Sequence, residues 1–321
     1  MLSRELLQQV RKLQIQTGRQ VADVLAGQYL SAFRGRGIEF DEVRPYVPGD
    51  EIRSIDWNVT ARTGKPFVKR YMEERQLTLM MMADISPSQD FGSQTRSKRD
   101  ATAELCALLA FSASNSDDKV GLALFHGGIE QYIQHRKGQK HSLRVVREVL
   151  AHGAVDKDRT DTKSLKRKWW LPFGHRRVSR KSQRQLTNIS GAMQFLMSVS
   201  VRRTVCFVIS DFQDDHFISA MQSANRRHDV IAVLMKDPRE RNIPNVGLVR
   251  LKDSETGRTK IYDSGSSGFR KHVQTMTDHR IESLRKMFYR SDIDFVEVDV
   301  TRSLVSPLIE FFRMRQKRIH R

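Results

Sequence analysis

Apolar strand patterns alternate with amphipathic helix patterns from residue 77 onward. Strands are predicted at 77–86 (LTLMMMADIS), Val120–His126, Thr204–Ser210, Asp229–Met235 and Asp294–Val298, and the apolar runs at 77–86 and Thr204–Ser210 are typical of strands covered on both faces of a parallel sheet. Helical spacing marks Lys98–Ser116, His141–Leu150, Thr187–Ser200, Phe217–Arg227, Phe269–Arg290 and Ser303–Arg313, and a hairpin is predicted over Val246–Tyr262. This order predicts an α/β domain over 77–321 with a doubly wound, mostly parallel, Rossmann-type sheet.

Residues 1–76 follow a different pattern and are predicted to form a separate N-terminal unit. Leu6, Val10 and Leu13 have helical spacing. The glycine-rich, charged stretch that follows has turn signals at 48–50 and 63–65, which predict short strands and irregular loops, including alternation around Val59. We expect Trp57 to be a structural anchor whose indole is packed against the fold.

Residues 156–185 interrupt the strand and helix rhythm with a basic insert. The segment has eleven Lys or Arg and three Asp, so it holds eight of the nineteen net positive charges of the chain. Trp169 and Trp170 lie beside the basic residues, a combination typical of an anionic membrane surface or an acidic protein surface. A solvated loop is an equal alternative. No DNA- or RNA-binding motif accompanies the insert, so nucleic acid is the less favoured partner.

Composition narrows the class of protein further. The 321 residues are 39% hydrophobic and 29% charged, which indicates a folded chain, and the sequence pI is about 10.3. Two cysteines, Cys106 and Cys206, are too few for a disulfide framework. The amphipathic N-terminus does not resemble a signal peptide, and the apolar runs are too short to span a bilayer. We therefore expect a cytoplasmic protein, with peripheral binding to the inner membrane left open.

Oxygen-bearing side chains gather where the predicted strands end. Asp84, Ser86 and Ser88 form a DxSxS motif after the first buried strand, Asp211 follows the second, and Thr187 opens a helix. Because the carboxyl ends of parallel strands share one edge, these side chains are expected to lie together. Carboxylates and hydroxyls are ligands suited to Mg²⁺ or Mn²⁺. Each motif alone would more often cap a helix or turn, but together they predict a metal site.

Two long stretches carry a family resemblance. Residues 34–75 (RGRGIEFDEVRPYVPGDEIRSIDWNVTARTGKPFVKRYMEER) and 97–125 (SKRDATAELCALLAFSASNSDDKVGLALF) resemble the bacterial domain of unknown function 58 family, as do the ISDF, HDVIAV and DPRE segments. That family implies a von Willebrand factor A-like domain with a metal-ion-dependent adhesion site. The family's metal ligands match Asp84, Ser86, Ser88, Thr187 and Asp211. Pro87 and Gln89–Asp90 replace its usual Met-rich sequence.

The resemblance implies a non-enzymatic adaptor, without catalytic residues or a small-molecule substrate, that binds protein partners through Mg²⁺ or Mn²⁺. The implied partners are a MoxR-type AAA+ ATPase and membrane-associated von Willebrand factor A proteins, in assembly of complexes or envelope stress. Two alternatives stay open from the residues themselves. The same carboxylates would suit a metal-assisted phosphohydrolase, although no nucleophile or base is visible beside them. The basic charge would suit a protein that binds nucleic acid or an anionic membrane.

Overall fold

The computed structural model describes residues 29, 32–33, 38–73, 77–94, 96–155, 187–252 and 258–319. The predicted N-terminal helix around Leu6, the basic insert at 156–185 and the hairpin turn at 255–257 lie outside these residues. Within the described ranges, no helix is long and apolar enough to cross a membrane.

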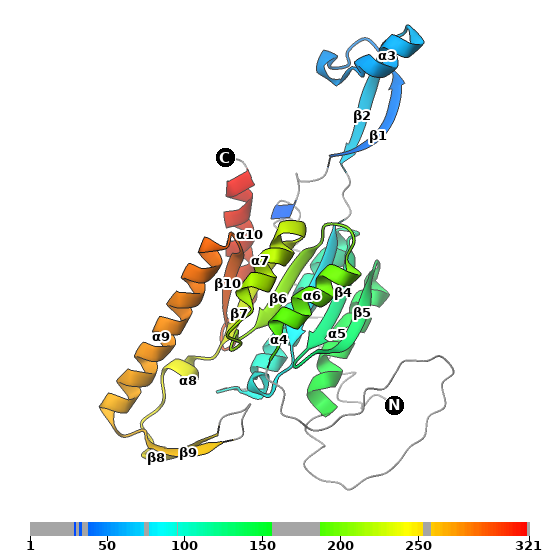
Figure 1. Cartoon of the computed structure of the whole chain (residues 1–321). Helices are drawn as coiled ribbons and strands as arrows, with labels where there is room; N and C mark the ends of the chain where they lie inside the picture. Colours follow the sequence, from blue (N-terminus) through cyan, green and yellow to red (C-terminus); the bar gives the residue numbers. More distant parts are fainter. Residues whose placement is uncertain are drawn as a thin grey trace, which may run out of the picture.

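A six-stranded sheet forms the centre of the fold (Figure 1). Its order is β10 (Asp294–Asp299), β7 (Asp229–Lys236), β6 (Val205–Ser210), β3 (Thr78–Asp84), β4 (Lys119–Phe125) and β5 (Ile129–Arg136). Five strands are parallel, and β5 pairs antiparallel with β4 at the edge. The predicted mostly parallel α/β fold is therefore confirmed. The antiparallel edge strand β5 was not predicted.

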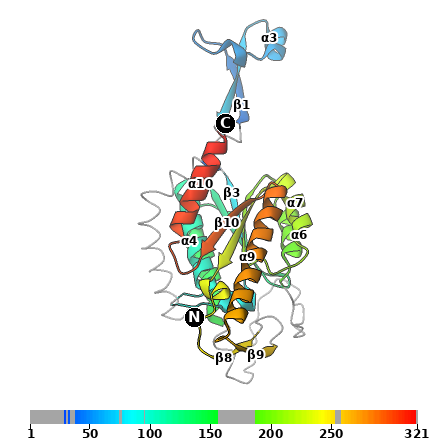
Figure 2. The same ribbon diagram turned by 90° about the vertical axis from the view of Figure 1, so that its left-hand side faces the viewer.

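Helices cover both faces of the sheet, which gives three layers (Figure 2). One face packs against α4 (Lys98–Asn115), α5 (Gln139–Val155) and α10 (Val305–Ile319), and the other against α6 (Ile189–Val199), α7 (Ile218–Arg227) and α9 (Ser267–Arg290). Neighbouring residues of one strand point to opposite faces, so Met81 packs on the α4 side and Met82 on the α6 side. This two-sided burial explains the continuous apolar runs.

The direction of chain winding reverses between β3 and β6. From β3 the chain moves outward to β4 and β5, then returns to β6 on the other side and continues to β7 and β10. In open α/β sheets, the loops diverge at such a reversal and ligands bind at the carboxyl ends of the strands there. Asp84 ends β3 and Asp211 follows β6, so both lie at this position.

An arm extends from the end of the sheet at which β3 begins (Figure 1). Strands β1 (Ile38–Pro45) and β2 (Phe67–Glu73) form an antiparallel hairpin, with η2 (Ile52–Ser54) and α3 (Trp57–Thr63) at its tip. The expected strand-like alternation at Val59 is wrong, because α3 is a helix that ends at Gly64 with φ +68°. The turn predicted at 48–50 is present, with Gly49 at φ +111°.

Trp57 is not the anchor that the sequence suggested. Its side chain is 67% exposed, at the first position of α3. The buried residue is its neighbour Asp56, which caps α3 by accepting hydrogen bonds from the N–H groups of Asn58 and Val59 at 2.9 and 3.3 Å. Asp56 also forms an ion pair with Lys69 of β2, so the carboxylate joins α3 to the hairpin.

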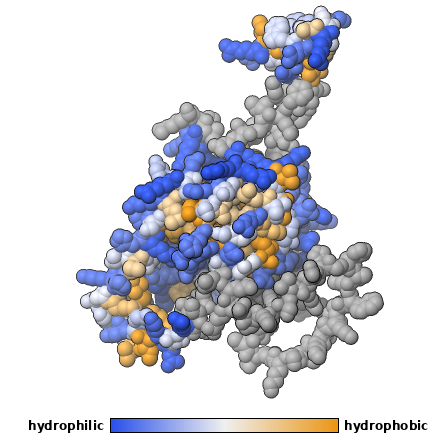
Figure 3. Space-filling model, in the orientation of Figure 1, coloured by the Kyte–Doolittle hydropathy of each residue, from blue (hydrophilic) through white to orange (hydrophobic). Residues whose placement is uncertain are grey.

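A second hairpin, β8 (Leu248–Lys252) with β9 (Thr259–Asp263), lies between the short helix α8 (Pro238–Arg241) and α9, as the sequence predicted. Tyr262 stacks on Phe269 of α9 with ring centroids 4.9 Å apart. Leu248 and Ile261 are exposed on the hairpin. Apolar side chains on the surface are visible there and at the tip of the arm (Figure 3).

Candidate functional site at the carboxyl edge of the sheet

The first part of the site is the loop that follows β3. Asp84 is 1% exposed, and Ser86 and Ser88 are also buried. The Ser86 N–H donates to Asp84 Oδ1 at 2.8 Å, and the Ser86 and Ser88 hydroxyl oxygens lie 2.9 Å apart. Pro87 begins η3 (Pro87–Asp90), a short helical turn that holds the second serine against the first. The DxSxS residues therefore form one connected, buried group.

The second part is the turn that follows β6, which is hydrogen-bonded to Asp84. The Ser210 hydroxyl donates to Asp84 Oδ2 at 2.6 Å and accepts the Phe212 N–H at 3.1 Å. Phe212 has φ +52°, which is unusual for a bulky residue. Its buried ring packs against Phe217 and Phe288, with centroids 5.4 and 5.2 Å away. Aromatic packing thus holds the turn that presents Asp211.

Thr187 approaches the same edge from the start of α6. It is buried, and the next residue, Asn188, donates its N–H to the carbonyl of His126 at the end of β4 at 2.8 Å. The N–H of Ile189 donates to Asp214 Oδ2, in the loop after β6, at 2.9 Å. These bonds tie the segment with Thr187 to the ends of both β4 and β6, so the five sequence-predicted residues all lie at one edge.

Electrostatics distinguish this edge from an ordinary set of capping residues. Burial and, second, the negative charge of Asp211 together raise the pKa of Asp84 to about 6, although the hydrogen bonds from Ser210 and Ser86 act in the opposite direction. Asp211 is 2% exposed, and its Oδ1 has no hydrogen-bond partner among the described residues. Two buried carboxylates therefore lie close together, and one of their oxygens, Asp211 Oδ1, has no partner in the described part of the chain.

Lys98 is a residue of the site that the sequence did not indicate. It is 0% exposed at the start of α4, and its ammonium lies 3.2 Å from Asp211 Oδ2 and also contacts Glu240 of α8. Ser210 was likewise missed as a partner of Asp84. The signal for Ser210 was present, because it is the hydroxyl residue directly before Asp211. Nothing local in the sequence marks Lys98 and Glu240 as partners.

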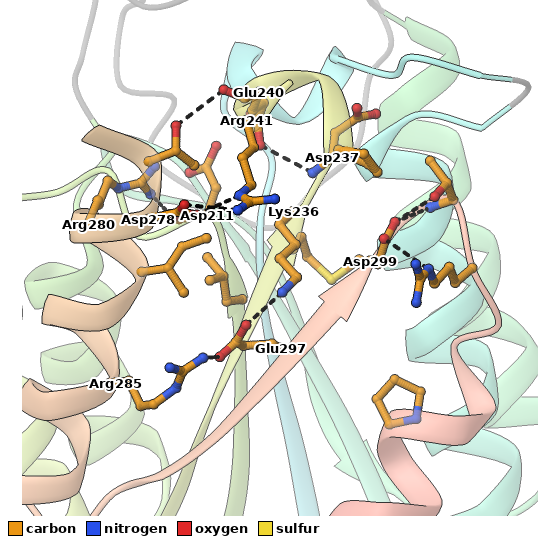
Figure 4. A pocket seen from close by; sticks show the side chains of 18 of the residues that line it. Asp211, Lys236, Asp237, Glu240, Arg241, Asp278, Arg280, Arg285, Glu297 and Asp299 are labelled. Atoms are coloured by element: carbon orange, nitrogen blue, oxygen red, sulfur yellow. Dashed lines mark hydrogen bonds and ion pairs between the residues drawn. The ribbon is translucent and has the colours of Figure 1, made fainter. Parts of the chain in front are cut away.

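Beside Asp211, a charged cleft of about 1160 Å³ opens between β7, β10, α8, α9 and the start of α10. Most of its charges are paired within the protein. Arg241 binds Asp278 through two nitrogens, and Lys236 and Arg285 both reach Glu297 (Figure 4). Arg280 donates to the backbone carbonyl of Asp211, which connects α9 to the turn after β6. The cleft and the buried edge are therefore neighbours that share Asp211.

The donor set fits a hard divalent cation. Two carboxylates and three hydroxyls supply only oxygen, which is the preference of Mg²⁺ and Mn²⁺. The unpaired oxygen of Asp211 and the raised pKa of Asp84 are both features that a bound cation would offset. The described part of the chain contains no group of three or more His, Cys, Asp or Glu side chains that could hold a metal ion. Serine and threonine hydroxyls would therefore have to act as ligands as well.

Comparison with known proteins gives a family match and several distant relatives. The family model described as "Protein of unknown function DUF58" matches residues 42–282. Uncharacterized protein Rv1480 of Mycobacterium tuberculosis (strain ATCC 25618 / H37Rv) is 28% identical over 249 residues, which are 77% of this chain and 70% of that protein. Uncharacterized protein Mb1516 of Mycobacterium bovis (strain ATCC BAA-935 / AF2122/97) matches to the same extent.

Solved structures match more weakly. The conserved hypothetical protein BatB from Bacteroides thetaiotaomicron is 16% identical with a TM-score of 0.42, and the match covers 75% of this chain and 99% of that chain. An aerotolerance-related membrane protein from Bacteroides fragilis NCTC 9343, with multiple mutations to serines, is 15% identical with a TM-score of 0.41 and the same coverage.

Proposed function

This chain belongs to the DUF58 family of proteins of unknown function, and from that premise we propose that it is a metal-dependent protein-interaction adaptor rather than an enzyme. The 77–321 unit would be a von Willebrand factor A-like domain. Its carboxyl edge would carry a metal-ion-dependent adhesion site for Mg²⁺ or Mn²⁺.

One observation carries the proposal: buried carboxylates and hydroxyls that are distant in sequence are joined at the reversal point of the sheet. The Ser210 bond to Asp84 crosses 126 residues of sequence. Burying such groups is unfavourable unless they are partnered, and a free carboxylate oxygen is the most unfavourable of them. Asp211 Oδ1 is such an oxygen within the described ranges. A ligand with positive charge would satisfy it.

The five predicted residues and Ser210 divide three roles in this proposal. Ser86, Ser88 and Thr187 offer neutral hydroxyl oxygens. Asp84 and Asp211 supply negative charge, directly or through water, and Ser210 orients Asp84. A bound divalent ion would supply an electrophilic position that a carboxylate of a protein partner completes. The two carboxylates formally balance the 2+ charge of the ion, but Lys98 offsets part of the Asp211 charge and the other three ligands are neutral hydroxyls. An acidic side chain from a partner would make up the difference.

The partners in this proposal are those implied by the resemblance of residues 34–75 and 97–125 to the family. They are a MoxR-type AAA+ ATPase and membrane-associated von Willebrand factor A proteins, with the adaptor working in the cytoplasm at the inner membrane surface. Assembly of enzyme complexes and envelope stress are the processes that such a set of partners would serve.

Metal removal tests the proposal most directly. We expect Mn²⁺ to bind the full chain with one-to-one stoichiometry in calorimetry, and Asp84→Ala to abolish that binding. Capture of the ATPase by the immobilised protein should need Mg²⁺ and be lost in EDTA. The matched control is Asp278→Ala, which removes a carboxylate from the neighbouring cleft and should leave both readouts unchanged. Capture that is unaffected by both EDTA and Asp84→Ala would refute the proposal.

A metal-assisted phosphohydrolase is the second candidate, and His126 is the observation that favours it. His126 follows β4 at the same edge, its Nδ1 is buried without a partner in the described part of the chain, and burial lowers its pKa, which favours the neutral imidazole. A neutral imidazole is a suitable general base. Phosphatase assays in Mn²⁺ with the natural protein and with His126→Ala decide between the candidates. We expect no turnover from either, and turnover lost in His126→Ala would favour the enzyme.

A further inference from the structure

Lys98 places a positive charge inside the candidate metal site. Its side chain is fully buried, and its Nζ lies 3.2 Å from Asp211 Oδ2 and also contacts Glu240 Oε1. Fully burying an ammonium group is costly even when it is paired, and an apolar residue would often be at least as stable at such a position. The buried pair is therefore poorly explained by stability alone.

The two oxygens of the Asp211 carboxylate have different surroundings. Oδ2 faces Lys98, whereas Oδ1 has no partner among the residues that the structure describes. Gln213 also donates to Oδ2, at 3.2 Å, so both protein donors use the same oxygen. One oxygen is thus held by the protein, and the other is left for a ligand.

We propose that Lys98 is a resident cation that competes with the divalent metal for Asp211 and keeps the metal site weak until a partner completes it. The inference rests on the proposed function and adds the regulation of the same site. The ammonium offsets one of the two negative charges of Asp84 and Asp211, and it repels a second cation drawn to the same carboxylate. Lys98 acts through Asp211, so it is a positioning residue.

Glu240 gives Lys98 a second carboxylate partner, so that Lys98 stays paired when Asp211 binds a metal ion. Its Oε2 accepts the N–H of Asp237 at 3.2 Å in the capping box of α8, and Asp237 in turn accepts the N–H of Ser93 at 2.8 Å. Glu240 is therefore held in place independently of Asp211. When Asp211 turns toward a metal ion, Lys98 keeps a carboxylate partner, and no unpaired ammonium is left in the interior.

Calorimetric titration of the full chain with Mn²⁺ tests the inference. We expect Lys98→Met to bind Mn²⁺ about tenfold more tightly or better, because the repulsion is removed and Asp211 is released. Lys98→Arg keeps the charge and should stay weak. The matched control is Lys236→Met, which removes a positive charge from the cleft beside Glu297, and its affinity should stay within about twofold of the natural protein because that charge is screened.

The Lys98→Met/Glu240→Gln variant guards against a folding failure, because it removes both members of the ion pair and glutamine preserves the capping box. It too should bind Mn²⁺ more tightly, and saturating Mn²⁺ should raise its Tm by more than that of the natural protein. Equal affinity in the natural protein and both Lys98→Met variants, with binding lost in Asp84→Ala, overturns this inference and leaves the proposed function intact. Weaker binding in those variants overturns it as well. No Mn²⁺ binding by any variant overturns the proposed function itself.

Discussion

The arm and the carboxyl edge lie at opposite ends of the sheet (Figure 1). They differ in how far their charged groups are exposed to water and in where those groups find partners. In the arm, the Arg44 and Asp50 side chains stay partly exposed and pair locally. Arg44 binds Asp50 through two nitrogens at 2.6 and 2.7 Å, and Asp50 also accepts the N–H of Val47. Such pairs contribute little to stability because water screens them. The arm leaves Ile52 and Trp57 exposed.

At the carboxyl edge the polar groups are withdrawn from water and depend on partners from distant segments. Asp84, Asp211 and Lys98 are all buried, and their bonds connect β3, β6, α4 and α8. Burial makes every electrostatic interaction there stronger and every missing partner more costly. Changes at the edge should therefore have large effects, while changes in the arm should have small ones.

The largest effect is expected from Phe212→Ala. The buried ring packs against Phe217 and Phe288 and supports the turn with Asp211, so its removal should lower the free energy of unfolding by about 3–5 kcal/mol. Chemical denaturation measures the change. Tyr289→Ala is the matched control, because that aromatic ring of α9 is 84% exposed and its loss should change stability by less than about 0.5 kcal/mol. Similar losses from both variants would contradict the contrast between buried and exposed aromatics.

Ser210→Ala is expected to have the next largest effect. It removes the 2.6 Å hydrogen bond to Asp84 and leaves the Phe212 N–H without its acceptor, so unfolding free energy should fall by about 1–3 kcal/mol. Ser223→Ala provides the comparison, since that exposed hydroxyl bonds only within α7 to the Ser219 carbonyl among the described contacts. If Ser210→Ala cost no more than Ser223→Ala, Ser210 would not hold Asp84 in place.

The sequence predicted the sheet well where strands are buried on both faces. Strands β3, β6 and β7 are apolar at nearly every position. This pattern is typical of a strand that is covered by helices on both faces of the sheet. Strand β5 lies at the edge, and its polar, partly exposed residues resemble a loop, so it was missed. Helix α3 has only seven residues, too few to establish a helical period, although Asp56 was a visible N-cap signal.

The candidate site was predictable to the extent that strand ends locate it. Asp84, Ser86, Ser88 and Asp211 follow buried strands, and topology alone places the ends of β3 and β6 side by side. The contacts of Lys98 depend instead on tertiary packing, because Asp211 and Glu240 lie 113 and 142 residues farther along the chain. A lysine at the first turn of a helix gives no local sign that it will be buried.

Asp118 is a buried carboxylate at the end of the sheet where β3 begins, and it allows the effect of burial on a charged group to be tested by varying the pH. Asp118 accepts the N–H of Leu77 at 2.8 Å beside the start of β3, and burial raises its pKa to about 6. The folded protein therefore holds this proton more tightly than the unfolded chain, whose aspartate pKa is about 3.9. The stabilising contribution is fully present below pH ~3.9 and is lost as pH rises through about 6.

Asp118→Asn isolates this contribution, because asparagine keeps an oxygen for the Leu77 N–H and does not titrate. The difference in unfolding free energy between the two proteins should shift by about 1–2 kcal/mol in favour of the variant between pH 4.5 and 7.5. Denaturation at each pH measures it. A difference that stays constant over this range would mean that Asp118 titrates normally in the folded protein.

Trp57→Ala is expected to have the smallest effect, and it tests the arm itself. With 67% of its surface exposed, the side chain contributes little packing, so amide hydrogen exchange across α3 should stay within about twofold of the natural rate. Asp56→Ala, one position earlier, removes the helix cap and the ion pair with Lys69, and should speed exchange in α3 by about five- to tenfold. Amide exchange is measured in α3 for both variants because the arm is held by local contacts. A global unfolding signal would therefore report little about it. An increase with Trp57→Ala as large as that with Asp56→Ala would restore the anchor role, and would mean that the indole packs in solution as the sequence first suggested.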